Sequence, residues 1–530
     1  MNNFIGTKTL VQLALRRDRV RLPAWLLGIA IMVGALTLGN AEFSAQEMKE
    51  MIIMASSSPG MRLFIAPIME GNIGELGPFI LLRTSFIIAI LVAMMNIQAV
   101  VRHTRENEET GCAEMLGSMV VGRYASLASA LIVAIGANVL MALLIALALM
   151  ANDQPAVGSF AAGASFAAFG LVFAGVAAVT TQLSESTRGS SGLASVTLAF
   201  AFLLNALGNV LGEVREGGLG FESAWVVWLS PLGWVQQVYA YGENNWWILI
   251  LFAILFAFLT YGSFILVNRR DVGRGILPAR PGPAAASPWL LSPLGLAWRL
   301  QRGTLLGWVI PIAVFGIIFG AASQEYASTI EGIELFQNIA LSAEYFLFSL
   351  ISIIAAIIAF YTMQAIMRLR AEEAGGPLES VLATAVSRFH VFSSHIAVSV
   401  FGTVALLSLF ALSSALAAGL SAGETLDLLK AALFQGAAVM TLAGFVIAAY
   451  GLLPRVAGTL SMLVVLVSLL AGAFGDLLNL PEVLQEMSPF SHVAPFPADV
   501  TTGSIAALLG IGLVLASIGL VAFRRRDLSL

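Results

Sequence analysis

Two polar stretches of equal length interrupt an otherwise apolar sequence, and their residues suit ion pairing. RENEETGCAEMLGSMVVGR spans residues 105–123, and RAEEAGGPLESVLATAVSR spans residues 370–388. Arg, Glu, Gly, Glu and Arg recur at matching places in both stretches. The first stretch has Arg105, Glu108, Gly111, Glu114 and Arg123, and the second has Arg370, Glu373, Gly376, Glu379 and Arg388. An arginine three residues before a glutamate suits a pair on one side of a helix, and the glycine suits a turn.

These stretches must lie in water. Each charged side chain costs about 2.5 to 3.5 kcal/mol at the centre of a bilayer, and the first stretch carries six of them. Gly111, and more firmly Gly375-Gly376-Pro377, should end the helix and fold each stretch back as a short hairpin. A plain solvated loop is the alternative, but a spacer needs neither a glycine at one fixed position nor a glutamate three residues later. The duplication therefore favours a functional loop.

The composition predicts an all-α polytopic membrane protein. Of the 530 residues, 58% are hydrophobic and only 11% are charged. Apolar runs of about 20 residues recur along the whole chain, each long enough to cross a hydrocarbon core of about 30 Å. We expect no separate soluble catalytic domain.

Hydropathy, with breaks at charges, Gly and Pro, predicts twelve transmembrane helices in two halves of six. Those of the first half are 22–40, 77–101, 124–150, 158–183, 191–212 and 246–268. Those of the second half are 304–323, 343–367, 389–420, 429–451, 457–478 and 502–523. Because six is even, both halves enter the membrane the same way up, as parallel repeats with pseudo-twofold symmetry.

Further sequence landmarks set the predicted domain boundaries. ALRRDRVRLPAWLLGIA (14–30) aligns with AWRLQRGTLLGWVIPIA (297–313), and Arg269-Arg270-Asp271 aligns with Arg525-Arg526-Asp527. The predicted first half is 1–274, with a flat-lying elbow helix at 8–21 and a loop at 102–123. A Pro/Ala-rich linker covers 275–288. The second half is 289–530, with an elbow helix at 289–303 and a loop at 368–388.

The distribution of charge predicts the orientation. The basic stretch before the first span, both polar loops and the terminal arginines all fall on one face, whereas the opposite loops are rich in acids. By the positive-inside rule that basic face is cytoplasmic, as are both chain termini. The single cysteine, Cys112, excludes an intramolecular disulfide.

The pattern E-x-x-G-x-x-E with a closing Arg, between spans 2 and 3 of a six-span unit that opens with a basic elbow, resembles a known family. It is similar to the coupling-helix region of the membrane subunits of ATP-binding-cassette exporters, which share their fold with the G-subfamily transporters. The fused twelve-span form most resembles the exporters of polyketide antibiotics of the tetronasin-resistance type. The second loop departs from the first, with Gly375-Gly376-Pro377 in place of Thr110-Gly111-Cys112.

The resemblance implies a permease in a bacterial cell membrane whose loops dock onto two cytoplasmic ATPase subunits. All ten loop residues named above would take part in that coupling, and ATP and Mg would bind to the partners. The sequence agrees with a separate motor, because its only Lys-Thr pair, Lys8-Thr9, lacks the Gly-rich frame of a P-loop. We therefore expect no catalytic site or cofactor in this chain, and no nucleic-acid partner.

The resemblance assigns the walls of the substrate pathway to spans 2 and 5 of each half. Their content suits amphiphilic or hydrophobic drug-sized molecules. The candidate pathway residues are Phe79, Arg83, Phe86, Asn96, Phe202, Asn205, Asn209, Glu344, Phe348 and Asp476. The phenylalanines could instead simply pack against neighbours or lipid. Arg83 could form an outer gate with Glu344 or reach water at the end of its span.

Other function classes fit the residues less well. An ion-coupled secondary transporter would need carboxylates in the middle of its spans, whereas here they lie at span ends. A membrane-embedded lipid-modifying enzyme would need one asymmetric cluster of catalytic groups, but the best polar clusters are two related loops. The four histidines form no H-E-x-x-H motif or Cys/His cluster, so no metal site is expected.

Overall fold

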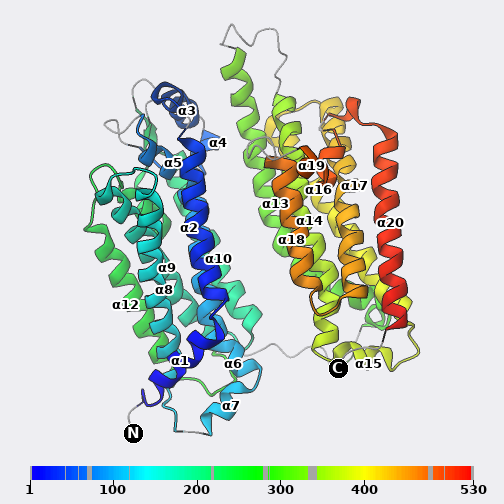
Figure 1. The fold of residues 1–530 in the computed structure, drawn as a ribbon, viewed down its shortest axis with the longest axis horizontal. Coiled ribbons are helices and arrows are strands. Elements are labelled where there is room, and N and C mark those ends of the chain that lie inside the picture. Colours follow the sequence, from blue (N-terminus) through cyan, green and yellow to red (C-terminus); the bar gives the residue numbers. More distant parts are fainter. Residues whose placement is uncertain are drawn as a thin grey trace. The chain divides into compact units, whose positions relative to one another are not determined.

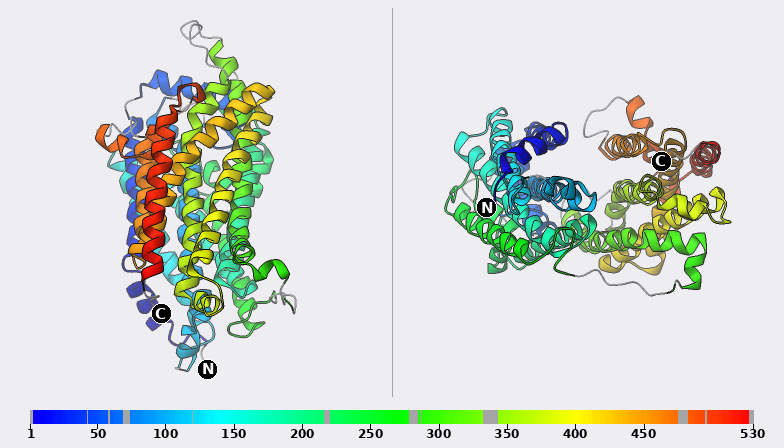
Figure 2. Two further views of the ribbon diagram at one scale, coloured as in Figure 1. Left: turned by 90° about the vertical axis from the view of Figure 1, so that its right-hand side faces the viewer. Right: turned by 90° about the horizontal axis from the view of Figure 1, so that it is seen from below.

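The computed structural model describes residues 3–41, 43–57, 59–68, 74–118, 120–215, 220–277, 285, 287–331, 343–474, 482–494 and 496–526. The chain divides into two compact units, which we call unit 1 (up to Gly282) and unit 2 (from Pro283). Each unit is a bundle of long helices that run side by side (Figures 1 and 2). The prediction of a mainly helical chain is confirmed.

Unit 1 contains the long helices that correspond to the first six predicted spans. They are α2 (Arg21–Asn40), α5 (Leu76–His103), α8 (Ala125–Met150), α9 (Ala156–Leu183), α10 (Thr187–Val210) and α12 (Ile248–Asn268). Shorter elements join them: α1 (Thr7–Arg17), α3 (Ala45–Ser57), α4 (Pro59–Arg62), α6 (Arg105–Glu109), α7 (Cys112–Gly117), β1 (Glu213–Val214), β2 (Phe221–Glu222), η3 (Trp225–Leu229) and α11 (Pro231–Gln237). The two strands pair antiparallel, with Glu213 opposite Glu222.

Unit 2 has a corresponding set of long helices. They are α13 (Pro293–Glu331), α14 (Ala343–Ala374), α16 (Arg388–Ala418), α17 (Ala422–Leu452), α18 (Ala457–Phe474) and α20 (Thr502–Arg525). Its short elements are η4 (Pro288–Leu291), α15 (Pro377–Leu382), α19 (Glu482–Glu486), η6 (Pro489–His492) and η7 (Pro497–Asp499).

The prediction of a multi-pass membrane protein is confirmed. In the part of the chain that the structure describes, 11 helices are long and apolar enough to span a membrane. The predicted span 457–478, the fifth of the second half, corresponds to a shorter apolar stretch, Ala457–Gly472, and its last residues lie outside the described ranges. The count of twelve and the repeat symmetry therefore remain predictions.

The two predicted elbow helices differ. In unit 1, α1 ends at Arg17 and α2 begins at Arg21, so the elbow is a separate helix. In unit 2, the predicted elbow 289–303 begins in η4, and its residues 293–303 are continuous with the following span within the single helix α13. Pro23 accounts for the difference, because it has no N–H to donate to the carbonyl of Arg19 and its ring clashes with that carbonyl, which disfavours a continuous helix through residues 18–20; the aligned residue of unit 2 is Leu306.

The centre of each bundle is buried and apolar. In unit 1, α9 is the most enclosed span and packs against α5, α8 and α12. Its glycines allow close approach: a side chain at Gly170 would collide with the amide groups of Asn96 and Asn138. In unit 2, α17 takes the corresponding central place and packs against α14 and α20. These enclosed cores fix the helix ends from which the polar loops emerge.

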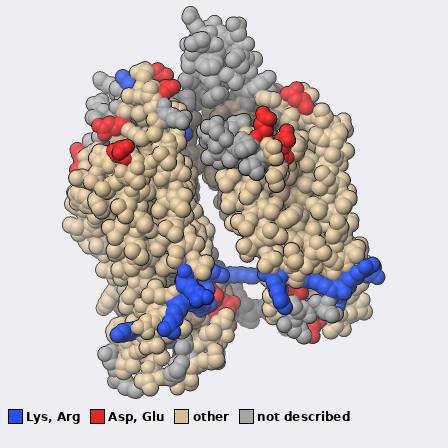
Figure 3. Space-filling view, in the orientation of Figure 1, with Lys and Arg blue, Asp and Glu red and all other residues tan. Residues whose placement is uncertain are grey.

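The predicted outer cap 41–76 contains α3 and α4, and Met48, Ile52 and Ile65 of this segment pack against Phe79 of α5. At the other end of unit 1 lie α1 and the polar loop with α6 and α7 (Figure 1). On the face shown in Figure 3, Lys and Arg side chains of each unit gather toward the end that carries the polar loop. The chain thus places its basic side chains where the charge pattern predicts them.

Candidate functional site

Glu108 fastens the base of the first polar loop to the segment that follows α12. Arg270 donates two parallel hydrogen bonds to its carboxylate, at 2.6 Å and 2.8 Å. Arg105 donates a third at 2.8 Å, which forms the helix-side pair that the spacing predicts. The backbone N–H of Gly273 donates a fourth at 3.2 Å. Bidentate, charge-assisted bonds of this kind are among the strongest in proteins, so this end of the loop is held firmly.

Arg105 is fully buried, although it belongs to a loop predicted to lie in water. Its Nε donates to the carbonyl of Thr181 at the end of α9 at 3.0 Å, and Nη2 donates to the same oxygen and, at 3.2 Å, to the carbonyl of Arg274. A buried guanidinium is tolerable only when such partners are present. Arg105 therefore cross-links the loop base to two other segments and cannot itself contact a second protein.

The second loop is fastened at the same place with different partners. Glu373 is almost completely buried, accepts a hydrogen bond from Arg526 at 2.7 Å and accepts another from the hydroxyl of Tyr450 at 2.7 Å. Arg370 lies farther away, at 4.0 Å, and its Nε donates to the carbonyl of Pro454 at 2.9 Å. Arg526 also lies over the rings of Tyr450 and Phe523. Each loop base is thus tied to the end of its unit's last span.

The two loop tips share one backbone geometry. Gly111 has φ +76° and Gly376 has φ +89°, both in the left-handed range that favours glycine. Each is followed by a helix of six residues, α7 or α15. Glu114 and Glu379 lie in the first turn of these helices and are exposed. The turn predicted from sequence is therefore present, and it presents an acidic side chain to the surroundings in each unit.

The arginines that close the loops bind backbone rather than carboxylates. Arg123 donates to the carbonyls of Val267 at 2.9 Å and Arg270 at 2.8 Å, both at the end of α12. Arg388 donates to the carbonyl of Arg526 at 2.8 Å, at the end of α20. Arginines at the C-terminal end of a helix satisfy its last carbonyls and its dipole. Both ends of each loop are consequently attached to the last helix of the same unit.

The junction of α1 and α2 contains a charged cluster that sequence reasoning missed. Asp18 is buried, with Arg102 Nη1 at 2.8 Å and His103 Nε2 at 2.5 Å. Burial acts to raise the pKa of the Asp18 carboxyl, but the hydrogen bond and charge of His103 and the charges of Arg102 and Arg21 outweigh it. The pKa is held below the ordinary value of 3.8. The signal was present, since Asp18 is the single acid among the arginines at 16–21.

Most candidate pathway residues of unit 1 are packed within that unit. Asn96 exchanges hydrogen bonds with Asn138 at 3.1 Å and 2.6 Å. Asn209 donates to the carbonyl of Ile65 at 3.0 Å, and Asn205 is buried. The aromatic candidates behave similarly. Phe79 is completely buried, Phe86 and Phe202 have ring centroids 4.5 Å apart, and in unit 2 Phe348 packs against Phe496. These contacts support the packing interpretation, and their pathway role remains a prediction.

Arg83, the sharpest pathway candidate, bonds within unit 1. Its Nη1 donates to Asn40 Oδ1 at the end of α2 at 2.8 Å, and the guanidinium lies over the ring of Phe79. The partner expected from sequence, Glu344, has a side chain outside the described atoms, and Asp476 lies outside the described residues altogether. The structure therefore shows Arg83 bonded to Asn40, and the predicted pair with Glu344 remains a prediction.

Comparison with known proteins assigns the family. A family described as "Multidrug efflux system permease Rv1217c, C-terminal domain" matches residues 8–266 and 290–524. The multidrug efflux system permease protein Rv1217c of Mycobacterium tuberculosis (strain ATCC 25618 / H37Rv) is 35% identical over 551 residues, which cover 99% of this chain and 96% of the relative. Such identity over nearly the whole of both chains shows common descent. The chain therefore belongs to the Rv1217c-type family of multidrug efflux system permeases.

Proposed function

We propose that the chain is the membrane subunit of an ATP-binding-cassette exporter that moves amphiphilic or hydrophobic molecules out of a bacterial cell. Alternating access, driven by two separate ATPase subunits, would supply the mechanism. The observation that carries the proposal is the pair of polar loops, each with an exposed acidic helix at its tip and buried ion pairs at its base. A loop that transmits a conformational change from a partner needs an exposed tip that the partner can bind and a base that is rigidly attached to the membrane helices.

The geometry divides the ten coupling residues into two groups. The members of the first group bind groups of their own unit, so they would hold the loop in position: Arg105, Glu108, Arg123, Arg370, Glu373 and Arg388. Glu114 and Glu379, placed by the glycines before them, would contact the ATPase. Because both ends of each loop are tied to α12 or α20, a push on the tip would pass directly to a membrane span.

The proposed orientation places the basic ends of both units, with α1, the loops and the end of α20, in the cytoplasm. The positive-inside rule supports this arrangement. ATP and Mg would bind only to the partner subunits. Twelve spans in parallel repeats, with the G-subfamily type of fold, complete the proposal. The hydrophobic substrate class, which includes antibiotics of the polyketide type, rests on the resemblance and on the name of the relative.

The test is ATP turnover by the permease reconstituted with a cognate ATPase. We expect a complex with two ATPase chains per permease and substrate-stimulated hydrolysis. The double variant Glu114→Lys/Glu379→Lys should remove the stimulation while leaving the chain folded in the membrane. The matched control is Glu50→Lys/Glu482→Lys, which reverses one exposed acid in each unit outside the loops.

The outcomes separate the possibilities. Stimulated turnover retained in the loop double variant would remove the loops from coupling. Equal loss in the control would mean that any charge reversal disturbs the complex. Transport by the purified chain with no ATPase attached would overturn the proposal in favour of an ion-coupled transporter.

A further inference from the structure

Unit 1 contains a polar cavity of about 160 Å³ at its basic end, apart from the loop tips. Its walls come from the α1–α2 junction, the last turns of α5, the start of α6 and the first turns of α10. Drug-sized ligands usually occupy pockets of about 300 to 1,000 Å³, so this cavity suits part of a molecule, such as the head of an amphiphile.

The cavity wall has an apolar and a polar part. Leu22, Trp25 and Met95 form the apolar part, whereas Arg21 and Gln98 belong to the polar part. The combination of a tryptophan ring with arginines at a span end is typical of the membrane–water interface. A ligand with a polar head and an apolar body would match both parts of the wall at once.

The charge on this wall is positive after the internal pairs are formed. Asp18 is engaged by Arg102 and His103, and Glu106 is paired with Arg17 at 3.1 Å. Both carboxylates of the wall are therefore already neutralised. Arg21 is exposed; its charge also acts on Asp18, but within the described residues it forms no ion pair at contact distance, since Arg102 and His103 occupy that carboxylate. An exposed guanidinium beside a cavity favours an anionic ligand, and phosphate oxygens suit its fork of donors.

The corresponding positions of unit 2 carry no charged side chains. In the sequence alignment of the halves, Asp18, Arg21, Gln98, Arg102 and Glu106 align with Gln301, Thr304, Met363, Met367 and Ala371, respectively. Trp25 aligns with Trp308 and Leu22 with Leu305, so the apolar part of the wall is retained.

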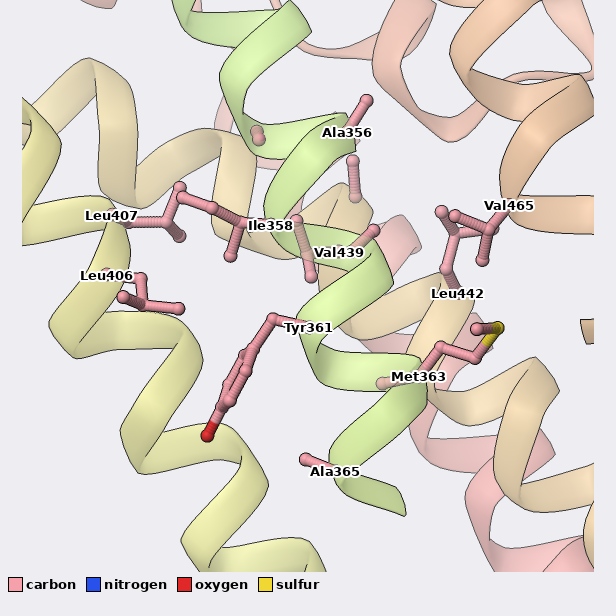
Figure 4. Packing of buried hydrophobic residues seen from close by; sticks show 14 of the residues in the cluster. Ala356, Ile358, Tyr361, Met363, Ala365, Leu406, Leu407, Val439, Leu442 and Val465 are labelled. Carbon is pink, nitrogen blue, oxygen red and sulfur yellow. The ribbon is translucent and has the colours of Figure 1, made fainter. Parts of the chain in front are cut away.

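The structure of unit 2 agrees with that change. Leu305 and Met363 are buried within its hydrophobic core, and Trp308 and Met367 pack against it. Figure 4 shows Met363 among the side chains of this core, on the same helix as Tyr361. The residues of unit 2 aligned with Leu22, Trp25, Gln98 and Arg102 are therefore part of apolar packing, whereas in unit 1 these four residues line an open, charged cavity. A general structural need of the repeat would not explain why arginines stand at positions 21 and 102 of unit 1 but not at the aligned positions 304 and 367 of unit 2.

We infer that this cavity binds the phosphate-bearing headgroup of an anionic membrane lipid, with the adjoining acyl chain along Leu22, Trp25 and Met95. The apolar wall favours a lipid over free phosphate, because a soluble anion has no use for it. The site is separate from the loop tips, and the inference does not depend on the proposed export function.

Native mass spectrometry of the purified full-length chain tests the inference. We expect the first phosphatidylglycerol molecule to bind more tightly than phosphatidylcholine. Arg21→Thr and Gln98→Met introduce the residues of unit 2 at two exposed positions, so folding should be unaffected. Loss of one arginine at a membrane surface should weaken phosphatidylglycerol binding by about five-fold, and the double variant should weaken it further.

Arg19→Thr is the matched control, since Arg19 is exposed, lies two residues from Arg21 and does not line the cavity. It should bind phosphatidylglycerol as the unmodified chain does. Equal weakening by Arg19→Thr would show that diffuse surface charge attracts the lipid, and the site would be rejected. Displacement of phosphatidylglycerol by millimolar inorganic phosphate, in an Arg21-dependent manner, would likewise overturn the assignment to a lipid. Unchanged binding in the double variant would do the same.

Discussion

The bases of the two polar loops both hold a glutamate, but its hydrogen-bond partners differ between the units. In unit 1, Glu108 is held by two arginines and a backbone N–H, so its charge is balanced by nearby cations. In unit 2, Glu373 has one close arginine and the hydroxyl of Tyr450. Both units attach the loop to the end of the last span. Because Glu108 has two close arginines and Glu373 only one, we expect loss of an arginine to destabilise unit 2 more than unit 1.

Aromatic rings replace the missing cation in unit 2. Tyr450 stacks on Phe392, and Phe392 stacks on Phe523 with centroids 4.8 Å apart. Arg526 lies over the rings of Tyr450 and Phe523, so cation–π attraction positions the guanidinium that binds Glu373. One loop thus depends on a charge network and the other on one charge pair supported by aromatic packing.

Removal of the arginine at the end of the last span should have the largest effect. Arg526→Ala leaves Glu373 buried with only Tyr450 and a distant Arg370, so we expect a loss of about 3 kcal/mol in stability. Arg270→Ala should cost about half as much, because Glu108 keeps Arg105. Chemical unfolding of the purified chain in detergent measures both. The exposed neighbours Arg269→Ala and Arg525→Ala are the controls, and equal losses for Arg270→Ala and Arg526→Ala would contradict the comparison.

The junction before the first span gives a second contrast between the units. Asp18→Gln imports the residue of unit 2, where Gln301 is buried beside His395 and Ser399. In unit 1 it would replace a carboxylate, which serves Arg102 and His103 with one oxygen each, by a neutral amide with a single acceptor oxygen, so we expect a loss of about 2 kcal/mol at neutral pH. The folded-state pKa of Asp18 lies below its unfolded value, so its contribution is complete above that value, near 3.8, and is lost as the pH falls through the folded-state pKa.

The measurement for Asp18→Gln is the melting temperature against pH. The gap between the unmodified chain and the variant should stay constant above about pH 5 and narrow below the ordinary aspartate value. Asn107→Ala, at another polar contact of α1 with the loop, is the control and should show no such narrowing. A gap that persists at the lowest pH would mean that the Asp18 carboxylate charge does not stabilise the junction.

The spans, the polar loops and their glycine turns could be predicted from the sequence because each depends on local residues. A run of about twenty apolar residues indicates a transmembrane helix, and Gly111 and Gly376 indicate turns, without knowledge of the rest of the fold. The contacts at the loop base could not be predicted in the same way. Glu108 of α6 meets Arg270 only because α5 and α12 both pack against α9, and the burial of Arg105 needs the carbonyl of Thr181.

Other features depend on single residues or on packing. The separate elbow of unit 1 follows from Pro23, and its absence in unit 2 follows from Leu306, a difference that the alignment already contained. The strand pair β1–β2 is only two residues long, too short for an alternating pattern to be visible. The Asn96–Asn138 pair joins two spans, and nothing local indicates which polar side chains in spans meet.

The loop tips should respond equally, in contrast to the bases. Gly111→Ala and Gly376→Ala each place a side chain at positive φ in open space, so the cost is backbone strain of about 1 kcal/mol in both units. Because local opening governs cleavage, limited proteolysis at each tip should become about five-fold faster. Gly375→Ala is the control, since its φ lies outside the left-handed range. Unequal rates would mean that the tips differ as the bases do.

The smallest effect concerns an ion pair that only unit 1 can form. Arg17 and Glu106 align with Leu300 and Ala371, and their side chains are about one-third exposed. Exposed pairs contribute little, so Glu106→Ala should cost no more than about 0.5 kcal/mol in unfolding experiments, and high salt should remove even that. The same variant removes the charged partner of Arg17, which keeps its hydrogen bond to Asn107, and removes a negative charge from the cavity wall. It should therefore strengthen phosphatidylglycerol binding while stability hardly changes. Weaker lipid binding in Glu106→Ala would instead mean that the Arg17–Glu106 pair holds the cavity in shape. The lack of this pair in unit 2, where Leu300 and Ala371 are aligned, would then help to explain why the positions aligned with Gln98 and Arg102 are apolar there.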